Sequence, residues 1–268
     1  MTRPRGRASS PCSRNSALAD EAAAARPLDG KLALITGASR GIGRAVARGL
    51  AEAGAHIIAV TLPRSTKALE ALDDEIRAVG GTATLVPLDL RDGQAIDQLG
   101  ASVAERWGRL DILIGNAGIL GDLSPFAHLE LKVWEDLIAV NLTANWRLIR
   151  AFDPLLRAAE AGRVIFLTSG AASKDKPYWG GYAVTKAGLE KLAKTYAAEV
   201  AKTPVRVNLV NPGPMRTLMR AKAMPGEDPA TLPPPEELVP LFLEMAGPDY
   251  EATGQVIDFQ SWRTRHRL

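Results

Sequence analysis

The sequence predicts an α/β fold, a single domain in which a doubly wound, parallel, seven-stranded sheet carries helices on both faces. From Asp29 onward, apolar runs of strand length alternate with helical patterns of ten or more residues. The candidate strands are continuous apolar runs, such as Val164-Ile-Phe-Leu167, which is typical of strands buried on both faces. Strict alternation of strand and helix implies right-handed crossovers and therefore a parallel sheet.

The individual elements follow from this alternation. The predicted strands are residues 32–36, 56–61, 83–88, 110–115, 163–168, 205–210 and 255–259. The predicted helices lie near residues 41–53, 66–79, 92–107, 131–158, 181–202 and 235–246. Ligands of such sheets bind beyond the carboxyl ends of the strands. The chemistry is therefore expected after residues 36, 61, 88, 115, 168 and 210.

The expected domain covers residues 29–262, with no internal linker and no repeat. Residues 1–28 are rich in Arg, Ser, Pro and Ala without apolar periodicity, so they are predicted to be a disordered basic extension. An over-long assigned start or a weak electrostatic tail are the alternatives. Residues 263–268 are predicted to be a basic tail, and the proline-rich stretch 212–235 an irregular, mobile segment.

Charge and composition exclude several classes of function. The net charge is +3, but the first 28 and the last six residues each carry +3, so the body between them is at −3. This distribution does not favour nucleic-acid binding. No apolar run has the length of a membrane span, and no secretory signal is recognisable. The single cysteine, Cys12, excludes an internal disulfide, and the three histidines lack metal-ligand spacing, so we expect a cytoplasmic protein without a metal site.

A glycine-rich turn, Thr36-Gly-Ala-Ser-Arg-Gly-Ile-Gly43, joins the first strand to the first helix. The free N–H groups at the start of a helix form a cradle for a phosphate anion. Glycines at 37, 41 and 43 fit positions where a side chain would block a pyrophosphate or hold the helix off the sheet. An ordinary strand–turn–helix is the alternative. The expected cofactor contacts in this turn are Gly37, Ser39, Arg40, Gly41, Ile42 and Gly43.

The residues after the second strand bear on which dinucleotide binds. A carboxylate there would accept a hydrogen bond from the adenosine 2′-hydroxyl and repel a 2′-phosphate. This chain has Ala59-Val-Thr-Leu-Pro-Arg64 instead, without a carboxylate. Arg40 and Arg64 can both reach a phosphate, which favours NADP over NAD, unless both arginines are simply solvated.

Two further strand ends carry candidate cofactor contacts. Asp89-Leu90 follows the third strand, and Asp89 can accept a hydrogen bond from an adenine amine. Asn116-Ala117-Gly118 follows the fourth strand, and its small residues allow the backbone to run close to the cofactor. A helix N-cap at Asp89 and a turn at Asn116 are the structural alternatives.

The most specific signal is Tyr182-Ala-Val-Thr-Lys186. Residues four apart share one face of a helix, and an ammonium beside a phenol stabilises the phenolate and lowers its pKa. Such a tyrosine can exchange a proton with an alcohol or carbonyl oxygen. Ser169, at the end of the fifth strand, is expected to place a hydroxyl near Tyr182, in the mouth of the binding site at the carboxyl ends of the strands.

Together these motifs resemble the short-chain dehydrogenase/reductase family, over nearly all of residues 29–259. The matching segments are residues 36–43, Asn116-Ala-Gly118, Asn141, Ser169, Tyr182-x-x-x-Lys186 and Asn211-Pro-Gly-Pro-Met-Arg-Thr217. The resemblance implies a Rossmann-type fold and an NAD(P)-dependent oxidoreductase that transfers a hydride between the nicotinamide and a secondary alcohol or ketone. A cofactor-binding scaffold or sensor without turnover is the alternative.

The resemblance also implies the roles of individual residues. Tyr182 is the implied acid/base and Ser169 orients the substrate oxygen. Lys186 holds the nicotinamide ribose and lowers the pKa of Tyr182. Asn141, otherwise a residue at a helix kink, anchors a water that relays protons to Lys186. Tyr182 and Lys186 also contact the cofactor, and Pro212, Gly213 and Thr217 close over the nicotinamide.

Three features depart from the family pattern or leave it open. Gly115 stands where the family usually has an asparagine, and Asp258-Phe-Gln-Ser-Trp262 replaces its usual terminal Gly-Gly. The segment between Thr217 and Glu236 predicts a small substrate lid.

Relatives pair through helices equivalent to 131–158 and 181–202, which implies a homodimer or homotetramer. The residues expected to wall the mouth for a small-molecule substrate are Leu120, Trp146, Tyr178, Trp179 and Met215.

Overall fold

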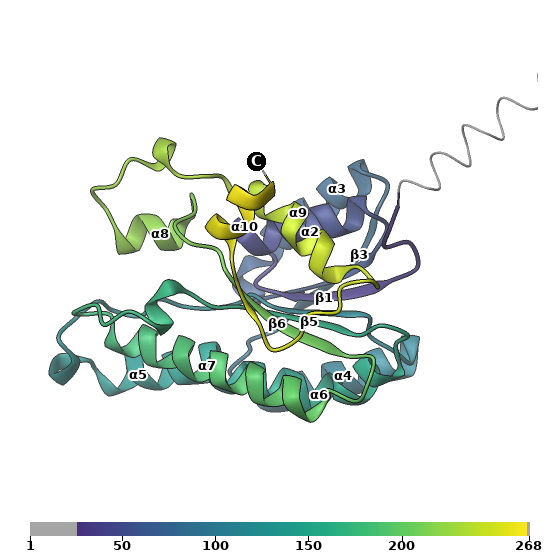
Figure 1. The fold of residues 1–268 in the computed structure, drawn as a ribbon, viewed down its shortest axis with the longest axis horizontal. Helices are drawn as coiled ribbons and strands as arrows, with labels where there is room; N and C mark the ends of the chain where they lie inside the picture. The colour runs from purple at the N-terminus through teal and green to yellow at the C-terminus, as the bar shows by residue number, and fades with distance from the viewer. Residues whose placement is uncertain (1–25, 267–268) are drawn as a thin grey trace, which may run out of the picture.

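A computed structural model describes residues 26–266 and shows a single parallel sheet of seven strands in the order β3-β2-β1-β4-β5-β6-β7 (Figure 1). The strands are β1 (Leu32–Thr36), β2 (His56–Thr61), β3 (Thr82–Pro87), β4 (Ile112–Gly115), β5 (Arg163–Leu167), β6 (Arg206–Asn211) and β7 (Val256–Asp258). The helices are α2 (Gly41–Glu52), α3 (Thr66–Ala78), α4 (Gly93–Trp107), α5 (Leu131–Ile138), α6 (Ala144–Ala158), α7 (Gly180–Glu199), α8 (Leu218–Ala223), α9 (Val239–Ala246) and α10 (Phe259–His266). The predicted fold class is confirmed.

Two hydrophobic cores lie on the two faces of the sheet. Helices α2, α3, α9 and α10 cover one face, and α4, α5, α6 and α7 cover the other (Figure 1). Successive residues of a strand point to opposite faces, so β1 sends Ala33 and Ile35 into the first core and Leu32 and Leu34 into the second. This explains why the strands are apolar without alternation.

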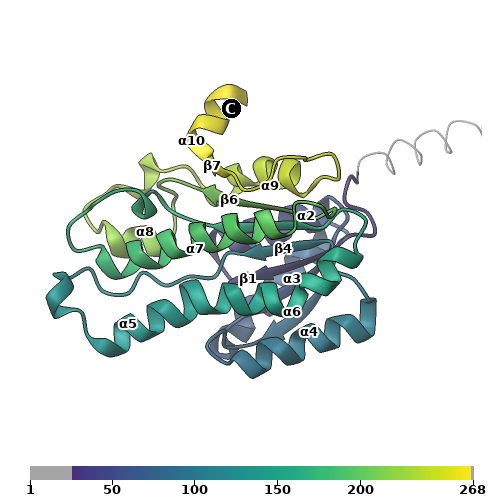
Figure 2. The same cartoon turned by 60° about the horizontal axis from the view of Figure 1, so that its bottom comes forward.

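The strand order creates a switch point between β1 and β4. β1 pairs with β2 on one side and β4 on the other, so the crossovers on the two sides run in opposite directions. The chain leaves β1 and β4 toward opposite sides of the sheet, and a switch point of this kind is where ligands bind, at the carboxyl edge of the sheet. The helix α8 lies beyond this same edge of the sheet (Figure 2).

The folded domain begins earlier than the predicted Asp29. Leu28 is 1% exposed in the first core, and the Arg26 guanidinium donates to the carbonyl oxygens of Val79 and Gly80. The expectation of disorder up to residue 28 is therefore wrong for residues 26–28. The remainder of the expected extension, residues 1–25, lies outside the described residues.

The basic C-terminal segment is also ordered differently from the prediction. Helix α10 runs through Arg263 to His266, and Trp262 within it is buried. His266 stacks on the Trp262 ring at 4.2 Å between ring centroids. The segment from Asp258 to Trp262 contains no glycine that would discourage a helix, and Phe259 and Trp262 pack into the first core. Residues 267 and 268 lie outside the described part.

Two other segments differ in structure from what their sequence predicts. The predicted helix 131–158 is interrupted at residues 139–143 by a π-helical turn between α5 and α6. The segment 212–235, predicted to be irregular, contains α8 and a short 3₁₀ turn (Pro229–Thr231). A bidentate ion pair between Arg220 and Glu227 joins α8 to the chain that follows it.

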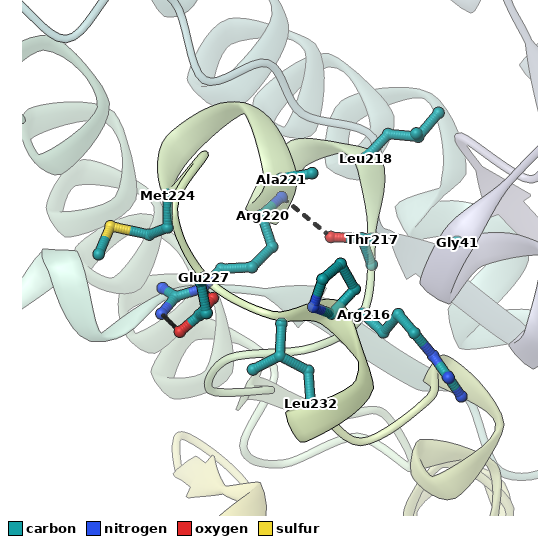
Figure 3. A pocket seen from close by; sticks show the side chains of 10 residues that line it. Gly41, Arg216, Thr217, Leu218, Arg220, Ala221, Met224, Glu227 and Leu232 are labelled. Carbon is teal, nitrogen blue, oxygen red and sulfur yellow. Dashed lines mark hydrogen bonds and ion pairs between the residues drawn. The ribbon is translucent and has the colours of Figure 1, made fainter.

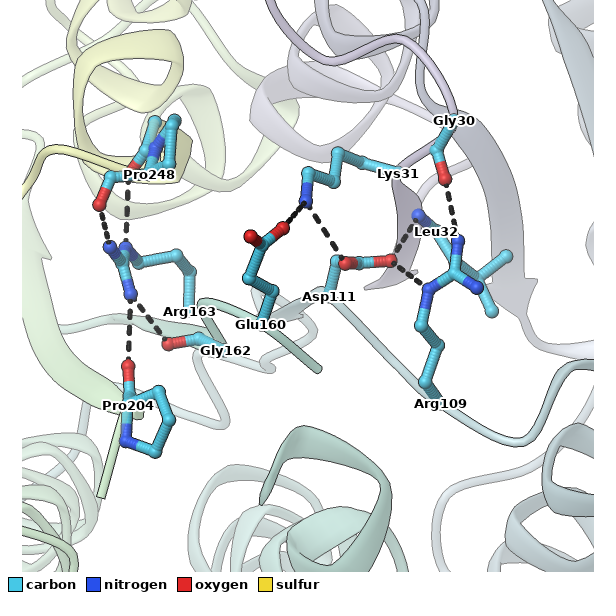
Figure 4. Close-up of polar contacts among 11 residues, drawn as sticks. Gly30, Lys31, Leu32, Arg109, Asp111, Glu160, Gly162, Arg163, Pro204 and Pro248 are labelled. Carbon is cyan, nitrogen blue, oxygen red and sulfur yellow. Dashed lines mark hydrogen bonds and ion pairs between the residues drawn. The ribbon is translucent and has the colours of Figure 1, made fainter. Parts of the chain in front are cut away.

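A polar network fastens the opposite, amino edge of the sheet (Figure 4). The buried Asp111 carboxylate accepts from the Leu32 backbone N–H at 2.9 Å and from Arg109 Nε at 3.3 Å. The buried Arg163 guanidinium donates to backbone carbonyls of four residues, Gly162, Pro204, Gly247 and Pro248. These contacts lie away from the carboxyl edge and hold strands and loops together. Within residues 26–266, no helix is both long and apolar enough to cross a membrane.

Candidate active site

The glycine turn packs as tightly as its sequence predicts. Gly37 has a φ of +69°, and a Cβ built there would lie 2.9 Å from Asn116 Nδ2. A Cβ on Gly43 would collide with the Gly37 carbonyl oxygen and with the Asn116 amide. Gly41 is different, because its nearest neighbour would be Thr217 at 3.5 Å. Gly37 and Gly43 therefore allow close packing, whereas Gly41 keeps an open surface at the start of α2.

The start of α2 suits an anion. Its N-cap residue, Arg40, makes no capping hydrogen bond with its side chain, and the first turn has no acidic residue. The N–H groups of the first turn thus have no side-chain acceptor, and the helix dipole favours negative charge there. Ser39 is buried and its hydroxyl lies 2.9 Å from that of Thr61, which joins this turn to the end of β2. Ile42 is half-buried against the first core.

Asn116 and its neighbours are bonded directly to the glycine turn. Asn116 Nδ2 donates to the carbonyl oxygens of Thr36 and Gly37. The Thr36 hydroxyl in turn accepts from the backbone N–H groups of Asn116 and Ala117, at 3.1 Å each. The loops after β1 and β4 therefore form one unit, in which Gly118 continues toward the polar residues on α7.

Ser169, Tyr182 and Lys186 come together at the carboxyl edge of the sheet. Ser169 follows β5, whereas Tyr182 and Lys186 lie in the first turns of α7 and are buried. Lys186 Nζ donates to the Leu167 carbonyl oxygen at 2.7 Å and lies 5.7 Å from the centroid of the Tyr182 ring. The sequence-predicted set is thus assembled from two elements.

Burial controls the titration of these groups. It lowers the pKa of the Lys186 ammonium from 10.5 to about 8. Burial also raises the pKa of Tyr182, and hydrogen bonding with the Ser169 hydroxyl partly offsets that rise. The expected lowering of the Tyr182 pKa by Lys186 is not what this structure shows, because the ammonium is directed at the Leu167 carbonyl and both groups are desolvated.

Asn141 lies in the π-helical turn, fully buried, and its side chain clamps the loop after β4. Its Oδ1 accepts from the Ile119 N–H at 2.8 Å, and its Nδ2 donates to the Ile119 carbonyl oxygen and to the Thr185 hydroxyl. Its own carbonyl oxygen accepts from Asn145 Nδ2. A Cβ on Gly118 would lie 3.4 Å from Asn141 Oδ1 and 3.6 Å from Lys186 Nζ. The missing side chain at Gly118 therefore leaves a small space that both polar groups face.

The segment after β6 faces the glycine turn. Gly213 has a φ of +68°, and Thr217 caps α8 by accepting from the Arg220 N–H at 3.2 Å. A cavity of about 310 Å³ lies between α8 and the chain that follows it, and Gly41 and Thr217 border it (Figure 3). The other residues lining it are Arg216, Leu218, Arg220, Ala221, Met224, Glu227, Pro229 and Leu232. Lys222 donates to the Gly121 carbonyl oxygen at 3.2 Å, so α8 also contacts the loop after β4.

The residues expected to contact the adenosine half of the cofactor are not joined to one another as Ser169, Tyr182 and Lys186 are. Asp89 follows β3 as expected, but Arg91 donates to both of its carboxylate oxygens and lowers its pKa. Leu90 beside it is half-buried. Arg40 and Arg64 are exposed, and neither makes a hydrogen bond or ion pair through its side chain with any residue between 26 and 266.

Two of the five expected wall residues lie elsewhere. Met215 is 2% exposed in the first core, and Trp146 is on the outer surface of α6 near the guanidinium groups of Arg147 and Arg150. Their sequence positions near the mouth did not reveal which face their side chains take.

The other wall residues remain near the mouth. Trp179 lies edge-on to the Tyr182 ring at 6.1 Å, and Leu120 is buried beside the clamped Ile119. Tyr178 is 60% exposed with a φ of +73°. Thr185 and Arg220 also belong to this region and were missed, because an isolated threonine or arginine in a helix gives no sequence signal.

Comparison with known proteins agrees with this geometry. The family model for short chain dehydrogenases matches residues 31–228. The Escherichia coli K12 oxidoreductase YciK is 35% identical over 240 residues, covering 88% of this chain and 94% of the relative. An NAD-dependent oxidoreductase of Mycobacterium tuberculosis is 37% identical over 206 residues, covering 72% of this chain and 74% of the relative.

A solved short chain dehydrogenase from Shigella flexneri, in complex with NADP, has a TM-score of 0.84 at 34% identity. The match covers 88% of this chain and 99% of that chain. The chain belongs to the short-chain dehydrogenase/reductase family, a family of oxidoreductases.

Proposed function

We propose that the protein is an NAD(P)-dependent oxidoreductase that interconverts a secondary alcohol and a ketone. The observation that carries this proposal is the placement of Ser169, Tyr182 and Lys186 at the carboxyl edge of the sheet. There they lie beside a glycine turn whose first helical turn has no side-chain cap. The acid/base group and the dinucleotide cradle thus share one edge, as hydride transfer requires.

The residues present fit a nicotinamide dinucleotide. The surface of Gly41 and the N–H groups at the start of α2 suit the pyrophosphate, and Asn116 to Gly118 bring backbone close beneath it. Pro212, Gly213 and Thr217 face them from the end of β6. When bound, the nicotinamide supplies the hydride. Arg40 and Arg64, exposed near the ends of β1 and β2, favour NADP, as in the solved Shigella relative, although the Mycobacterium relative is described as NAD-dependent.

The chain's own residues manage the proton. The Tyr182 hydroxyl exchanges a proton with the substrate oxygen, and the Ser169 hydroxyl holds that oxygen in place. Lys186 lies behind the tyrosine ring, where its ammonium can bind the nicotinamide ribose. Asn141 would anchor a water that relays protons to Lys186, and the proximity of both groups to Gly118, whose Cβ would lie 3.4 Å from Asn141 Oδ1 and 3.6 Å from Lys186 Nζ, supports this role. A homodimer or homotetramer and a small-molecule substrate complete the proposal.

The test replaces Tyr182 with phenylalanine. Tyr182→Phe should retain cofactor binding and lower turnover by about a thousandfold, because general acid–base catalysis contributes on the order of 10²–10⁴. Turnover is measured by NAD(P)H absorbance over a panel of ketones and secondary alcohols. Tyr250→Phe, which removes a hydroxyl in the loop between α9 and β7, is the matched control and should remain active. Turnover of Tyr182→Phe at the wild-type rate would contradict the assignment.

A further inference from the structure

We propose that Asp258, on the last strand, is a positioning residue that sets the nicotinamide-facing turn at Pro212-Gly213. The inference rests on the proposed function, because it assigns that turn to the nicotinamide half of the cofactor. It extends the site to β7 and α10, the part of the chain that departs from the family's Gly-Gly pattern.

The sheet register brings Asp258 to the site. β6 and β7 are parallel, and Asn211 pairs with Asp258. Asn211 Nδ2 donates to Asp258 Oδ2 at 3.0 Å. The other carboxylate oxygen, Oδ1, accepts from the backbone N–H and the hydroxyl of Ser261 at 2.9 Å each. Asp258 therefore joins the end of β6 to the first turn of α10.

The carboxylate decides which way the Asn211 amide faces. A carboxylate only accepts hydrogen bonds, so the NH₂ group of Asn211 must face Asp258 and its oxygen must face the other way. That oxygen, Oδ1, accepts from the Gly213 N–H at 3.3 Å. Gly213 has a φ of +68°, one of several conformations open to a glycine, and the bond to Asn211 Oδ1 favours this one over the others. Without Asp258, the Asn211 amide can rotate and this bond is lost.

The turn held in this way lies between α10 and the candidate catalytic residues. A Cβ on Gly213 would lie 3.4 Å from Gln260 Nε2 of α10, and a Cβ on Gly170 would lie 3.8 Å from Asn211 Nδ2. Gly170 directly follows Ser169. The Asn211 amide therefore lies close to both Gly213 and the Ser169 loop.

Helix α10 is itself firmly anchored. Phe259 and Trp262 belong to the same buried core as Met215, which lies between Gly213 and Thr217. Trp262 Nε1 donates to Glu244 Oε2 at 2.8 Å. A rigid helix gives Asp258 a fixed position from which to orient the turn.

The expected effect is confined to one half of the cofactor. Asp258 and Asn211 lie at the β6–β7 edge, whereas Arg40 and Arg64 follow β1 and β2 on the other side of the switch point. Loss of the Asp258 contact should therefore weaken the nicotinamide half and leave the adenosine half unchanged. A merely structural role would affect both halves equally, through the fraction of folded protein.

The experiment is isothermal titration calorimetry on the full chain with two probes, NADPH and adenosine 2′,5′-bisphosphate, which lacks the nicotinamide half. Asp258→Ala should raise the Kd of NADPH about tenfold, the loss of one hydrogen bond to a charged group, with an unchanged Kd for the bisphosphate. Thr264→Ala, an exposed position on α10, is the matched control and should change neither Kd.

Exchanging Asn211 and Asp258 distinguishes an effect on the orientation of the Asn211 side chain from a general loss of protein stability. Asn211→Asp places two carboxylates together and should weaken NADPH binding. The double variant Asn211→Asp with Asp258→Asn restores one donor and one acceptor in reversed order, leaves an oxygen for the Gly213 N–H, and should recover the affinity. Absence of this recovery, or a parallel loss for both probes, overturns the inference. A wild-type protein that binds neither probe overturns the proposed function instead.

Discussion

Lys186 shows how a buried charge is tuned at a single residue. Its side chain is 4% exposed, and its ammonium has the Leu167 carbonyl oxygen as a hydrogen-bond acceptor. Burial disfavours the charged form and lowers its pKa to about 8. Near neutral pH the ammonium therefore remains charged while it is close to the point of losing its proton, which suits the role proposed for it beside Tyr182.

This pKa predicts a pH dependence of stability. Between about pH 8 and pH 10 the unfolded chain keeps the Lys186 proton while the folded chain releases it, so stability rises with pH through that window. We expect the free energy of unfolding of the wild type, relative to Lys186→Met, to increase by about 2 kcal/mol from pH 8 to pH 10. Urea denaturation at several pH values measures this difference. If the free energy of unfolding changed with pH in the same way for both proteins, the pKa of Lys186 would not be lowered in the folded state, and the prediction would be wrong.

The exposed arginines predict cofactor preference. Arg40 and Arg64 have no ion-pair partner within residues 26–266, and each can meet the 2′-phosphate of NADP. We expect NADPH to bind more tightly than NADH, and Arg40→Ala to reduce that preference about tenfold by weakening NADPH alone. Fluorescence titration of both cofactors measures the preference. Arg48→Ala, an exposed arginine on α2 that pairs with Glu52, is the control. Tight NADH binding with no NADPH binding would contradict the prediction.

At the scale of elements, the π-helical turn is the clearest case of structure serving a site. A π turn inserts one extra residue into a helix and is costly by itself. Here it places Asn141 where its side chain makes three hydrogen bonds, to both backbone groups of Ile119 and to Thr185. These contacts compensate for the irregular turn and fix the loop after β4.

Arg163 holds loops in place at the amino edge of the sheet, as Asn141 does at the carboxyl edge. Its guanidinium joins the start of β5 to the loops around Pro204 and Gly247. Arg163→Leu leaves several partly buried carbonyl oxygens without a donor and should lower the free energy of unfolding by about 3 kcal/mol. Arg48→Leu, which removes an exposed i,i+4 ion pair, should change it by no more than about 0.5 kcal/mol. Urea denaturation compares the two, and a similar small loss for both would refute this role for Arg163.

At the scale of the whole molecule, the layer formed by α5, α6 and α7 leaves large apolar side chains in solvent. Leu131 is 70% exposed, Trp146 45% and Val184 42%. Exposed apolar side chains on each of these three helices favour association of copies through this layer.

This surface predicts the oligomeric state. We expect a homodimer or homotetramer, and we expect Trp146→Glu to shift it toward monomer because a charge at an apolar contact must be desolvated. Leu218→Glu, which changes an equally apolar exposed side chain on α8, should not. Light scattering after size-exclusion chromatography measures the mass. A monomeric wild type, or a variant that keeps the wild-type mass, would exclude this surface as the interface.

The prediction from sequence was most accurate where local signals are strong. Strands β1 and β2 begin and end where predicted, since their residues form uninterrupted apolar runs between turn residues. The glycine turn and the Tyr182 to Lys186 spacing also predicted which groups meet at the carboxyl edge of the sheet, because each follows from local backbone geometry. Helix α10 and the burial of Leu28 and Met215 were missed, because only contacts distant in sequence reveal them.

The sequence by itself determined the α/β class, the glycine-rich turn and the residue types of the candidate site. Strand burial, helix periodicity and motif spacing each depend on residues that are close together in the sequence. Only the tertiary structure decided how these groups interact. In the folded chain Lys186 donates a hydrogen bond to the Leu167 carbonyl oxygen, Arg91 donates to Asp89, and Asn211 donates to Asp258. Burial and hydrogen-bond partners depend on which strands become neighbours, and that is a property of the packed sheet.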